Sequence, residues 1–387
     1  MNPEEFQSSP SGHLVPTIQN CFAFVPNPLP PPSLNLTDLL PLLVRATRTV
    51  GELSGIGRTL PNPFFLIRPY MRMEAIASSK IEGTVTTLSE LFEFEAGADS
   101  VQARADTKEV HNYIRALEYG LKRIHELPIS TRFISELHGI LMSDVSPARG
   151  AQFQPGAFKI DQNWIGARLI QNARFVPPPQ IESMTALGEL EKYINEKTDS
   201  LPLIVKLALI HYQFEAIHPF PDGNGRVGRI LIPLLLCDRN EMSQPLLYLS
   251  PYFEKNYAEY IDRMLDISRR GAWEAWIEFF LIGIEQSCKK AIKKAHTLQD
   301  LYAGYRARIQ TARSSALLAR IVDALFDAPA TNIPYTMARL GITYNSAKNN
   351  IQRLIDCGIL EAETIQRRPK WFYANEIIEV AYKEETP

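Results

Sequence analysis

One segment of twelve residues holds most of the side chains that could do chemistry. Residues 218–229 read HPFPDGNGRVGR. His218 titrates near neutral pH, so its neutral imidazole can take the proton from an attacking hydroxyl. Asp222 offers the hard carboxylate oxygen that Mg²⁺ binds while phosphate oxygens and waters complete its shell. These two residues predict a general base beside a metal ligand, with the metal arriving on a nucleotide.

A glycine-rich turn and two arginines follow the carboxylate. Gly223 and Gly225 flank Asn224, and only glycine lets a tight loop turn successive N–H groups inward against a phosphate. Arg226 begins the next helix, whose N-terminus adds partial positive charge. Arg229 lies three residues further on the same helix face. A histidine before proline commonly ends a helix and Asp-Gly-Asn-Gly commonly forms a turn, but neither explains both arginines.

The segment fits the signature His-x-Phe-x-(Asp/Glu)-Gly-Asn-Gly-Arg-x-x-Arg at every specified position and so resembles Fic-domain proteins. This resemblance implies transfer of AMP from Mg-ATP to a Tyr, Thr or Ser hydroxyl of a target protein, auto-AMPylation included, with release of diphosphate. It implies that His218 is the base, that Asp222 binds Mg²⁺ and that Arg229 holds the γ-phosphate. Phe220 would anchor the loop in the core. The ATP-binding residues implied are Gly223, Asn224, Gly225, Arg226, Val227, Gly228, Arg229 and Asn256.

The assignment of Asn256 comes from a second stretch of the same family. Residues 249–257 read LSPYFEKNY and resemble the segment that lines the adenosine side of the pocket. Asn256 is the residue chosen there for a base or ribose contact. The residues that follow, YAEYI, differ from the more usual Arg-x-x-Tyr-Tyr pattern of the family.

An upstream motif predicts regulation. Residues 78–83 read SSKIEG and resemble the (Ser/Thr)-x-x-x-Glu-(Gly/Asn) motif of the inhibitory helix in autoinhibited Fic proteins. Ser78 and Glu82 are four residues apart and share one helix face, and Gly83 can end that helix. The resemblance implies that Glu82 pairs with Arg229 and prevents productive docking of the γ-phosphate.

A third segment is expected to position the target. Between Pro155 and Pro179, short β-type stretches surround a polar turn, which predicts a β-hairpin. The hairpin resembles the Fic flap, which holds a target segment by strand-like main-chain pairing. A purely structural hairpin that covers the core fits the same residues. The stretches are 158–160, 163–166 and 173–176.

Composition restricts the class of protein. The 387 residues are 45% hydrophobic and 22% charged, with a net charge of −2. The chain is therefore globular and lacks the overall basic field expected for non-specific nucleic-acid or anionic-membrane binding. No apolar run approaches the roughly 18–20 residues that span a bilayer. We expect a cytoplasmic protein without membrane contact. The four scattered cysteines predict neither a zinc site nor disulfides: Cys21, Cys237, Cys288 and Cys357.

The expected fold is mostly α: a Fic helical core with a β-hairpin flap and a C-terminal winged-helix-like domain. Prolines at 26–32 favour an extended polyproline arm at the N-terminus, and a 3.6-residue apolar period dominates from Leu36. His138 and His211 are expected to be packing residues. The domains expected are an N-terminal arm with the inhibitory helix at 1–105, the catalytic core at 106–290, and a linker helix with the winged-helix-like unit at 291–387.

The C-terminal unit raises a second class of function. Helices expected near 316–326, 335–340 and 346–357, then two strands around a basic turn, resemble a winged helix. Its third helix and turn could contact DNA through Asn345, Lys348, Asn349, Arg353, Arg367, Arg368 and Lys370. Residues 310–387 nevertheless carry nine Lys or Arg and nine Asp or Glu, so the unit as a whole is not basic.

The main function expected is autoinhibited AMP transfer. The alternatives are a Fic-type phosphotransferase or de-AMPylase, and a winged-helix DNA-binding regulator that uses nucleotide as a ligand. Since a ligand sensor has no need of His218, the signature favours the enzyme. The family resemblance also suggests a homodimer.

Overall fold

The structure is a computed structural model that describes residues 1–59, 64–96, 105–145, 154–196, 201–310, 316–363 and 369–383. It is mostly helical, as predicted, with two small antiparallel sheets. Two helices form the centre, because their apolar residues lie on all sides and such helices must be buried. They are α7 (Leu203–Ile217) and α8 (Asn224–Asp238), and the loop between them carries the signature.

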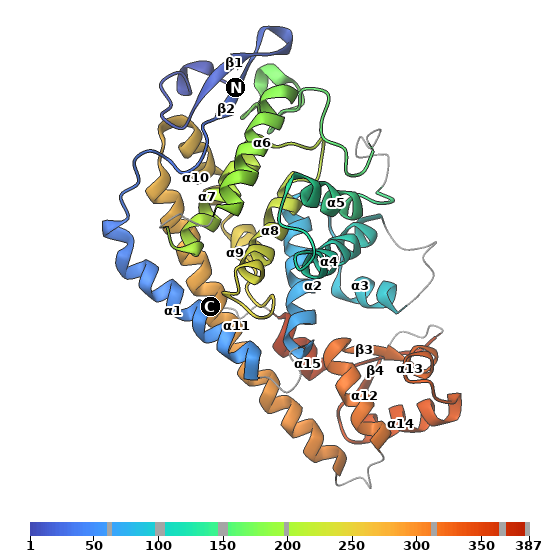
Figure 1. Ribbon diagram of the computed structural model, residues 1–387. Coiled ribbons are helices and arrows are strands. Elements are labelled where there is room, and N and C mark those ends of the chain that lie inside the picture. The colour runs from blue at the N-terminus through green and yellow to red at the C-terminus, as the bar shows by residue number, and fades with distance from the viewer. Residues whose placement is uncertain are drawn as a thin grey trace.

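Other helices surround this pair (Figure 1). On one side α4 packs against α5 and α8, and α6 packs against α7. The long helix α11 contacts α7 and α10, and α1 runs along its outer side. The bounds are α1 (Leu40–Thr59), α3 (Leu88–Glu95), α4 (Ala105–Arg123), α5 (Thr131–Leu141), α6 (Gln180–Asn195), α9 (Ser250–Lys255), α10 (Tyr257–Arg270) and α11 (Trp273–Gln310).

The helix that carries the SSKIEG motif is α2 (Phe64–Ile81). It contacts α4, α8 and α9, and so reaches the signature loop from the side. Gly83 follows the helix with φ +82°, a backbone conformation that glycine adopts without strain. The predicted helical position of Ser78 and the glycine stop are therefore both observed.

Part of the N-terminal arm forms a β-hairpin that was not predicted. Residues 12–26 form a hairpin of β1 (Gly12–Pro16) and β2 (Phe22–Pro26), with Gly12 opposite Pro26. Phe24 is fully buried, and its N–H donates to the carbonyl of Val176. Four consecutive residues of β2, 23–26, are buried, and β2 contacts α6 and α7, so the hairpin is held on the body.

The expected flap hairpin is reduced to one antiparallel bridge, between Ile165 and Phe175. The Ile165 N–H donates to the Phe175 carbonyl at 2.9 Å, and the Arg174 N–H donates to the Ile165 carbonyl at 2.8 Å. Elsewhere the segment pairs with the signature loop instead of with itself: the Lys159 N–H donates to the Pro219 carbonyl at 2.9 Å. The expectation of paired strands at 158–160 was wrong, because these backbone groups find partners in the loop.

The C-terminal part contains helices at the three predicted places, plus a strand and a helix that were not predicted, β3 and α15. Its sheet is antiparallel in the order β3-β5-β4, and Arg367 and Arg368 lie outside the described residues. The winged-helix assignment stays a prediction. The elements are α12 (Ala316–Asp327), β3 (Ala330–Asn332), α13 (Ile333–Leu340), α14 (Tyr344–Asp356), β4 (Glu361–Ala362), β5 (Trp371–Tyr373) and α15 (Asn375–Tyr382).

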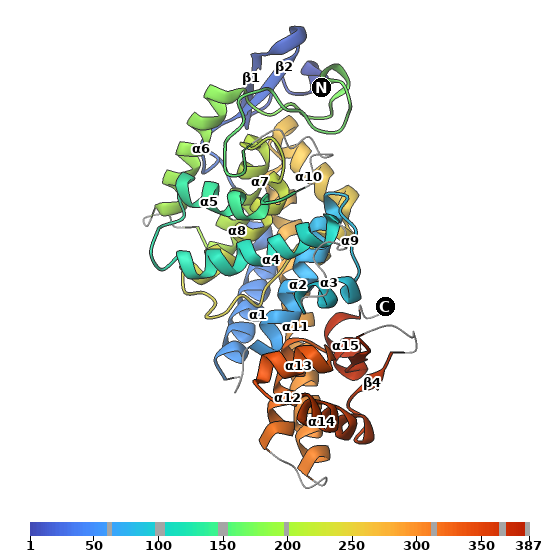
Figure 2. The same ribbon diagram turned by 90° about the vertical axis from the view of Figure 1, so that its right-hand side faces the viewer.

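This part sits at the far end of α11 and against α2 (Figure 2). α11 continues unbroken through residue 290, where the catalytic core was expected to end. The guanidinium of Arg72 on α2 is buried, pairs with Glu95 at 2.7 Å and donates to the Tyr382 hydroxyl at 3.3 Å.

None of the helices described here combines the length and the apolar character that crossing a bilayer requires.

Candidate active site

The signature loop is held by its own side chains. His218 ends α7 with φ 49° and ψ 60°, and Gly223 leads into α8 with φ 76°. Between them Asn224 closes the loop: its Oδ1 accepts the Phe220 N–H and its Nδ2 donates to the Phe220 carbonyl, both at 2.8 Å. Phe220 is fully buried and stacks on the ring of His138, with centroids 3.8 Å apart. Asn224 and Phe220 therefore fix the loop's shape.

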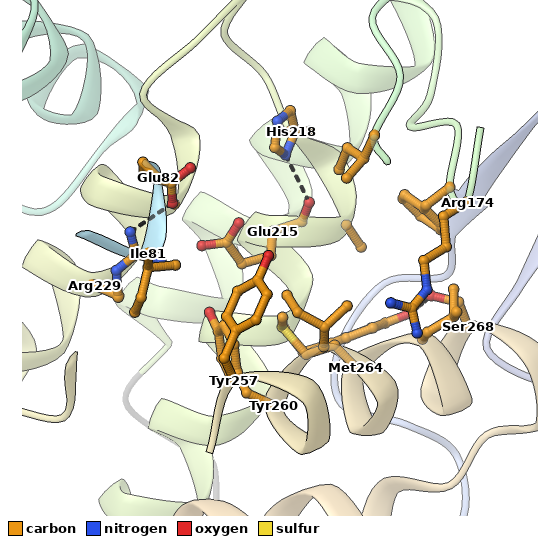
Figure 3. A pocket seen from close by; sticks show the side chains of 17 residues that line it. Ile81, Glu82, Arg174, Glu215, His218, Arg229, Tyr257, Tyr260, Met264 and Ser268 are labelled. Carbon is orange, nitrogen blue, oxygen red and sulfur yellow. Dashed lines mark hydrogen bonds and ion pairs between the residues drawn. The ribbon is translucent and has the colours of Figure 1, made fainter. Parts of the chain in front are cut away.

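The ring of His218 is oriented for accepting a proton. Its Nδ1 lies 3.2 Å from the carbonyl of Glu215, so Nδ1 carries the hydrogen and Nε2 is left as the acceptor (Figure 3). Burial lowers the pKa of His218 to about 4, and the positive charge of Lys159 is the second largest cause. His218 is therefore neutral at pH 7.

Asn163 holds the loop from outside, since its Nδ2 donates to the carbonyls of His218 and Phe220 at 3.2 and 3.0 Å.

The start of α8 holds a carboxylate against its backbone. A Cβ added to Gly225 would overlap Glu82 Oε1, so the Glu82 carboxylate lies directly on the glycine. Arg229 donates through Nη2 to Glu82 Oε1 at 2.6 Å and to the Ser78 carbonyl at 3.0 Å, and through Nε to Ser78 Oγ at 2.8 Å. Figure 3 shows Glu82 and Arg229 side by side at one end of the cavity.

The charges of this contact stabilise one another. Burial opposes ionisation of Glu82, but the guanidinium of Arg229 outweighs it, so the pKa of Glu82 lies below its usual value. Burial likewise opposes the charge on Arg229, whose side chain is only 2% exposed, while Glu82 raises its pKa. The structure thus brings the predicted inhibitory residues Ser78 and Glu82 onto the second arginine of the signature.

Arg226 is placed differently from Arg229. Its side chain is completely buried, and its Nη1 donates to Oε2 of Glu109, which is equally buried, at 2.9 Å. Its Nη2 lies 3.8 Å from Asp222 Oδ1. The guanidinium of Arg226 therefore lies beneath the loop with a carboxylate partner of its own, and it does not line the cavity.

Asp222 is the carboxylate available to a metal. Its side chain is 32% exposed, and its Oδ1 accepts the Gly223 N–H at 2.6 Å. Within the part of the chain that the structure describes, His, Cys, Asp and Glu side chains form no group of three or more that could hold a metal by themselves. A single carboxylate suits Mg²⁺ that is carried by phosphate oxygens.

The cavity has a volume of about 170 Å³. At one end lie Glu82, His218, Gly225 and Arg229. The rest is largely apolar and includes Tyr212, Tyr257, Tyr260, Ile261 and Met264.

Six of the eight predicted ATP-binding residues lie outside the lining: Gly223, Asn224, Arg226, Val227, Gly228 and Asn256. The side chains of Asn224 and Val227 and the residue Gly228 are buried in α8. Asn256 bonds within its own helical region, where its Nδ2 donates to the Tyr252 carbonyl at 2.9 Å. Its role in nucleotide binding stays a prediction, and its neighbour Tyr257 is the residue that reaches the cavity.

Two further ionisable residues face the site without having been predicted. Glu215 lines the cavity, its Oε1 has no hydrogen-bond partner among the described residues, and burial raises its pKa to about 7. Lys159 is almost fully buried, donates to Asn163 Oδ1 at 2.8 Å, and has a pKa that burial lowers to about 7. Glu215 could have been found from its place one helical turn before His218, whereas no local pattern points to Lys159.

His138 and His211 are packing residues, as expected. His138 is buried, accepts the Gly156 N–H on Nδ1 at 2.9 Å, and bonds through Nε2 to the Asp222 carbonyl at 3.0 Å. His211 is buried and bonds through Nε2 to the Tyr260 hydroxyl at 2.8 Å. Burial lowers the pKa of both rings, so both are neutral at pH 7.

Family models match both segments of the chain that form this site. The family model described as Fic/DOC family N-terminal matches residues 40–122, which include α2, and the model described as Fic/DOC family matches residues 128–236, which include the signature. The protein adenylyltransferase Fic of Drosophila grimshawi is 30% identical over 162 residues, which are 40% of this chain and 31% of that protein. The corresponding protein of Drosophila melanogaster is 28% identical over the same length. The chain thus spans about three tenths of these relatives.

Solved structures extend the likeness to most of the fold. A Fic family protein from Desulfovibrio desulfuricans superposes with a TM-score of 0.58 at 17% identity and covers 89% of this chain and 98% of its own. Fic-1 from C. elegans superposes with a TM-score of 0.51 at 19% identity over 67% of this chain and 75% of its own. Because the fold, the signature loop and two family models agree, the chain belongs to the Fic-domain proteins.

Proposed function

We propose that this Fic-domain protein is an autoinhibited protein adenylyltransferase, which transfers AMP from Mg-ATP to a Tyr, Thr or Ser hydroxyl of a target protein. Its likeness to the Fic adenylyltransferases supports a transferase of the AMPylation type. The observation that carries the finer proposal is the Glu82 carboxylate, which rests on Gly225 and pairs with Arg229 at 2.6 Å beside His218. A blocked nucleotidyl transfer site needs a neutral base and an acidic group that occupies the place of a phosphate, and His218 and Glu82 fit these two roles.

The reaction uses His218 as the base. Its Nε2 takes the proton of the target hydroxyl, whose oxygen then forms a bond to the α-phosphorus of ATP. The bond from that phosphorus to the bridging oxygen of the β-phosphate breaks, and diphosphate leaves. The N–H groups at the start of α8, around Gly225, and the guanidinium of Arg229 would bind the phosphates.

Asp222 would hold Mg²⁺ together with the phosphates of the bound ATP. The single partly exposed carboxylate fits such a shared ion better than a metal held by protein ligands alone. The ion supplies neutralisation of phosphate charge when it is bound. Arg226, already paired with Glu109, supports the loop that presents Asp222 and is a positioning residue in this proposal.

Inhibition follows from competition for Arg229. While Glu82 and Ser78 occupy the guanidinium, the γ-phosphate cannot pair with it, so bound ATP does not present its α-phosphorus for in-line attack. The apolar end of the cavity, with Tyr257, Tyr260 and Ile261, would accept the adenosine. The backbone around Ile165, which borders the cavity, would align the target segment.

Parallel labelling reactions test the chemistry. The Glu82→Gly chain is incubated with Mg-ATP that carries its label on either the α- or the γ-phosphate, and with a cell lysate as the source of target proteins. The double variant Glu82→Gly, His218→Ala is the matched control. The proposal predicts protein-bound label from the α-phosphate alone and a loss of that label in the double variant.

Other outcomes point elsewhere. Transfer of the γ-label would make the protein a phosphotransferase, and release of AMP from an AMPylated protein would make it a de-AMPylase. Absence of all three would favour a nucleotide-responsive regulator acting through the C-terminal part. The domain boundaries at 105/106 and 290/291, the homodimer, DNA binding and the cytoplasmic location stay predictions.

A further inference from the structure

A second cavity, of about 90 Å³, lies among α2, α9 and α11, away from the signature loop. Figures 1 and 2 both show these three helices side by side. Tyr70 and Met73 of α2 line it, on a different face of that helix from Ser78. The cavity shares none of its lining residues with the site described above.

Its lining carries positive charge only. Lys255 comes from the end of α9, and Lys290 and Lys294 come from successive turns of α11. No Asp or Glu is among the described residues that line it. Lys294 already donates to the Ala381 carbonyl at 2.9 Å. Lys255 and Lys290, by contrast, have no ion pair or hydrogen bond to any residue of the described ranges, although nearby Lys289 and Lys80 pair with Glu285 and Glu254.

The walls offer aromatic surface. Tyr248, Tyr252 and Tyr70 line the cavity, and the Tyr252 ring packs closely on Gly283, which fixes its position. The Tyr248 side chain is 5% exposed, and its buried hydroxyl finds no hydrogen-bond partner within the described part of the chain. That hydroxyl has almost no surface on the cavity, so the aromatic faces are what the walls offer to a ligand.

From these observations we infer that the cavity binds a small organic phosphate with an aromatic or other apolar part. The two ammonium groups of Lys255 and Lys290, which have no ion pair among the described residues, match the charge of a phosphate monoester, and lysine binds phosphate as a point charge. Tyr252, Met73 and Pro251 would pack on the apolar part of the ligand.

Pyridoxal 5′-phosphate is a suitable probe, because it is an aromatic phosphate whose aldehyde condenses with a lysine amine in a linkage that borohydride makes permanent. The full-length protein is treated with increasing probe, reduced, digested and mapped by mass spectrometry. Lys293, exposed on α11 but outside the cavity, is the internal control. Pyridoxal, which lacks the phosphate, is the matched reagent.

The inference predicts saturable labelling of Lys255 or Lys290, faster than that of Lys293 by at least about tenfold, the difference that one charge-assisted hydrogen bond can make. Phenyl phosphate should suppress this labelling, and pyridoxal should show no such preference. Equal, non-saturating labelling of Lys255, Lys290 and Lys293, or equal rates with pyridoxal, would overturn the inference.

Discussion

The buried ion pair beneath the signature loop permits a sharp prediction about stability. Glu109 and Arg226 are 1% and 0% exposed, and Glu109 Oε2 also accepts the Thr84 hydroxyl at 3.1 Å. Glu109→Gln keeps the shape but leaves the guanidinium of Arg226 without its charged partner. Breaking a buried pair in this way typically costs about 3–5 kcal/mol. Asp222, 3.8 Å from the same guanidinium, remains, so we expect the lower end of that range, about 3 kcal/mol.

Urea unfolding followed by circular dichroism measures this change, provided that the dependence on urea concentration stays the same. Glu259→Gln is the control, because Glu259 pairs with Arg263 on the surface, where the two side chains are 49% and 35% exposed. Its expected loss is below about 1 kcal/mol. If both variants unfold at the same urea concentration, the charge of Arg226 does not depend on Glu109 and the account of the loop's support is wrong.

Three further predictions concern the site itself. Because the pKa of His218 is lowered to about 4 and only the neutral ring accepts a proton, the transfer rate of the Glu82→Gly chain should stay level as pH falls from neutrality and should drop only as pH approaches 4; a fall centred near pH 6.5 would show a normal histidine. Gly225→Ala should abolish transfer even in the Glu82→Gly background, because its Cβ would fill the space over the backbone of residue 225 where the phosphates are proposed to bind. Full activity of that double variant would show that phosphate binding at Gly225 is not part of the mechanism. Asn163→Ala should lower the midpoint temperature of thermal unfolding, because the carbonyls of His218 and Phe220 lose their donor. An unchanged midpoint would show that these two hydrogen bonds do not stabilise the loop.

The local parts of the site could be predicted from the sequence because their chemistry is contiguous. Residue type and spacing placed His218 at the end of one helix and Gly225 and Arg229 at the start of the next. The distant partner Glu82 was reached only through a motif, because no periodicity joins residues 147 positions apart. In the structure, Glu82 Oε1 lies 2.6 Å from Arg229 Nη2, which is a direct ion pair.

Other features were out of reach for reasons of packing. Arg226 is a phosphate ligand by its type, but the buried carboxylate of Glu109, from a different helix, draws its guanidinium under the loop. The short β-type stretches of the flap predicted a hairpin, but the backbone N–H of Lys159 donates to the loop carbonyl of Pro219 instead. Which partner a backbone N–H or a charged side chain takes is decided by tertiary contacts that local sequence does not encode.

The central claim is that Glu82 restrains AMP transfer by holding Arg229. Its most direct test is the initial rate of AMP transfer by the unaltered chain and by Glu82→Gly, measured side by side at saturating Mg-ATP labelled on the α-phosphate. A hydrogen bond to a charged group is worth about 1.5–3 kcal/mol. The account therefore predicts a rate increase of about 10- to 150-fold for Glu82→Gly. Equal rates from two active chains would contradict it.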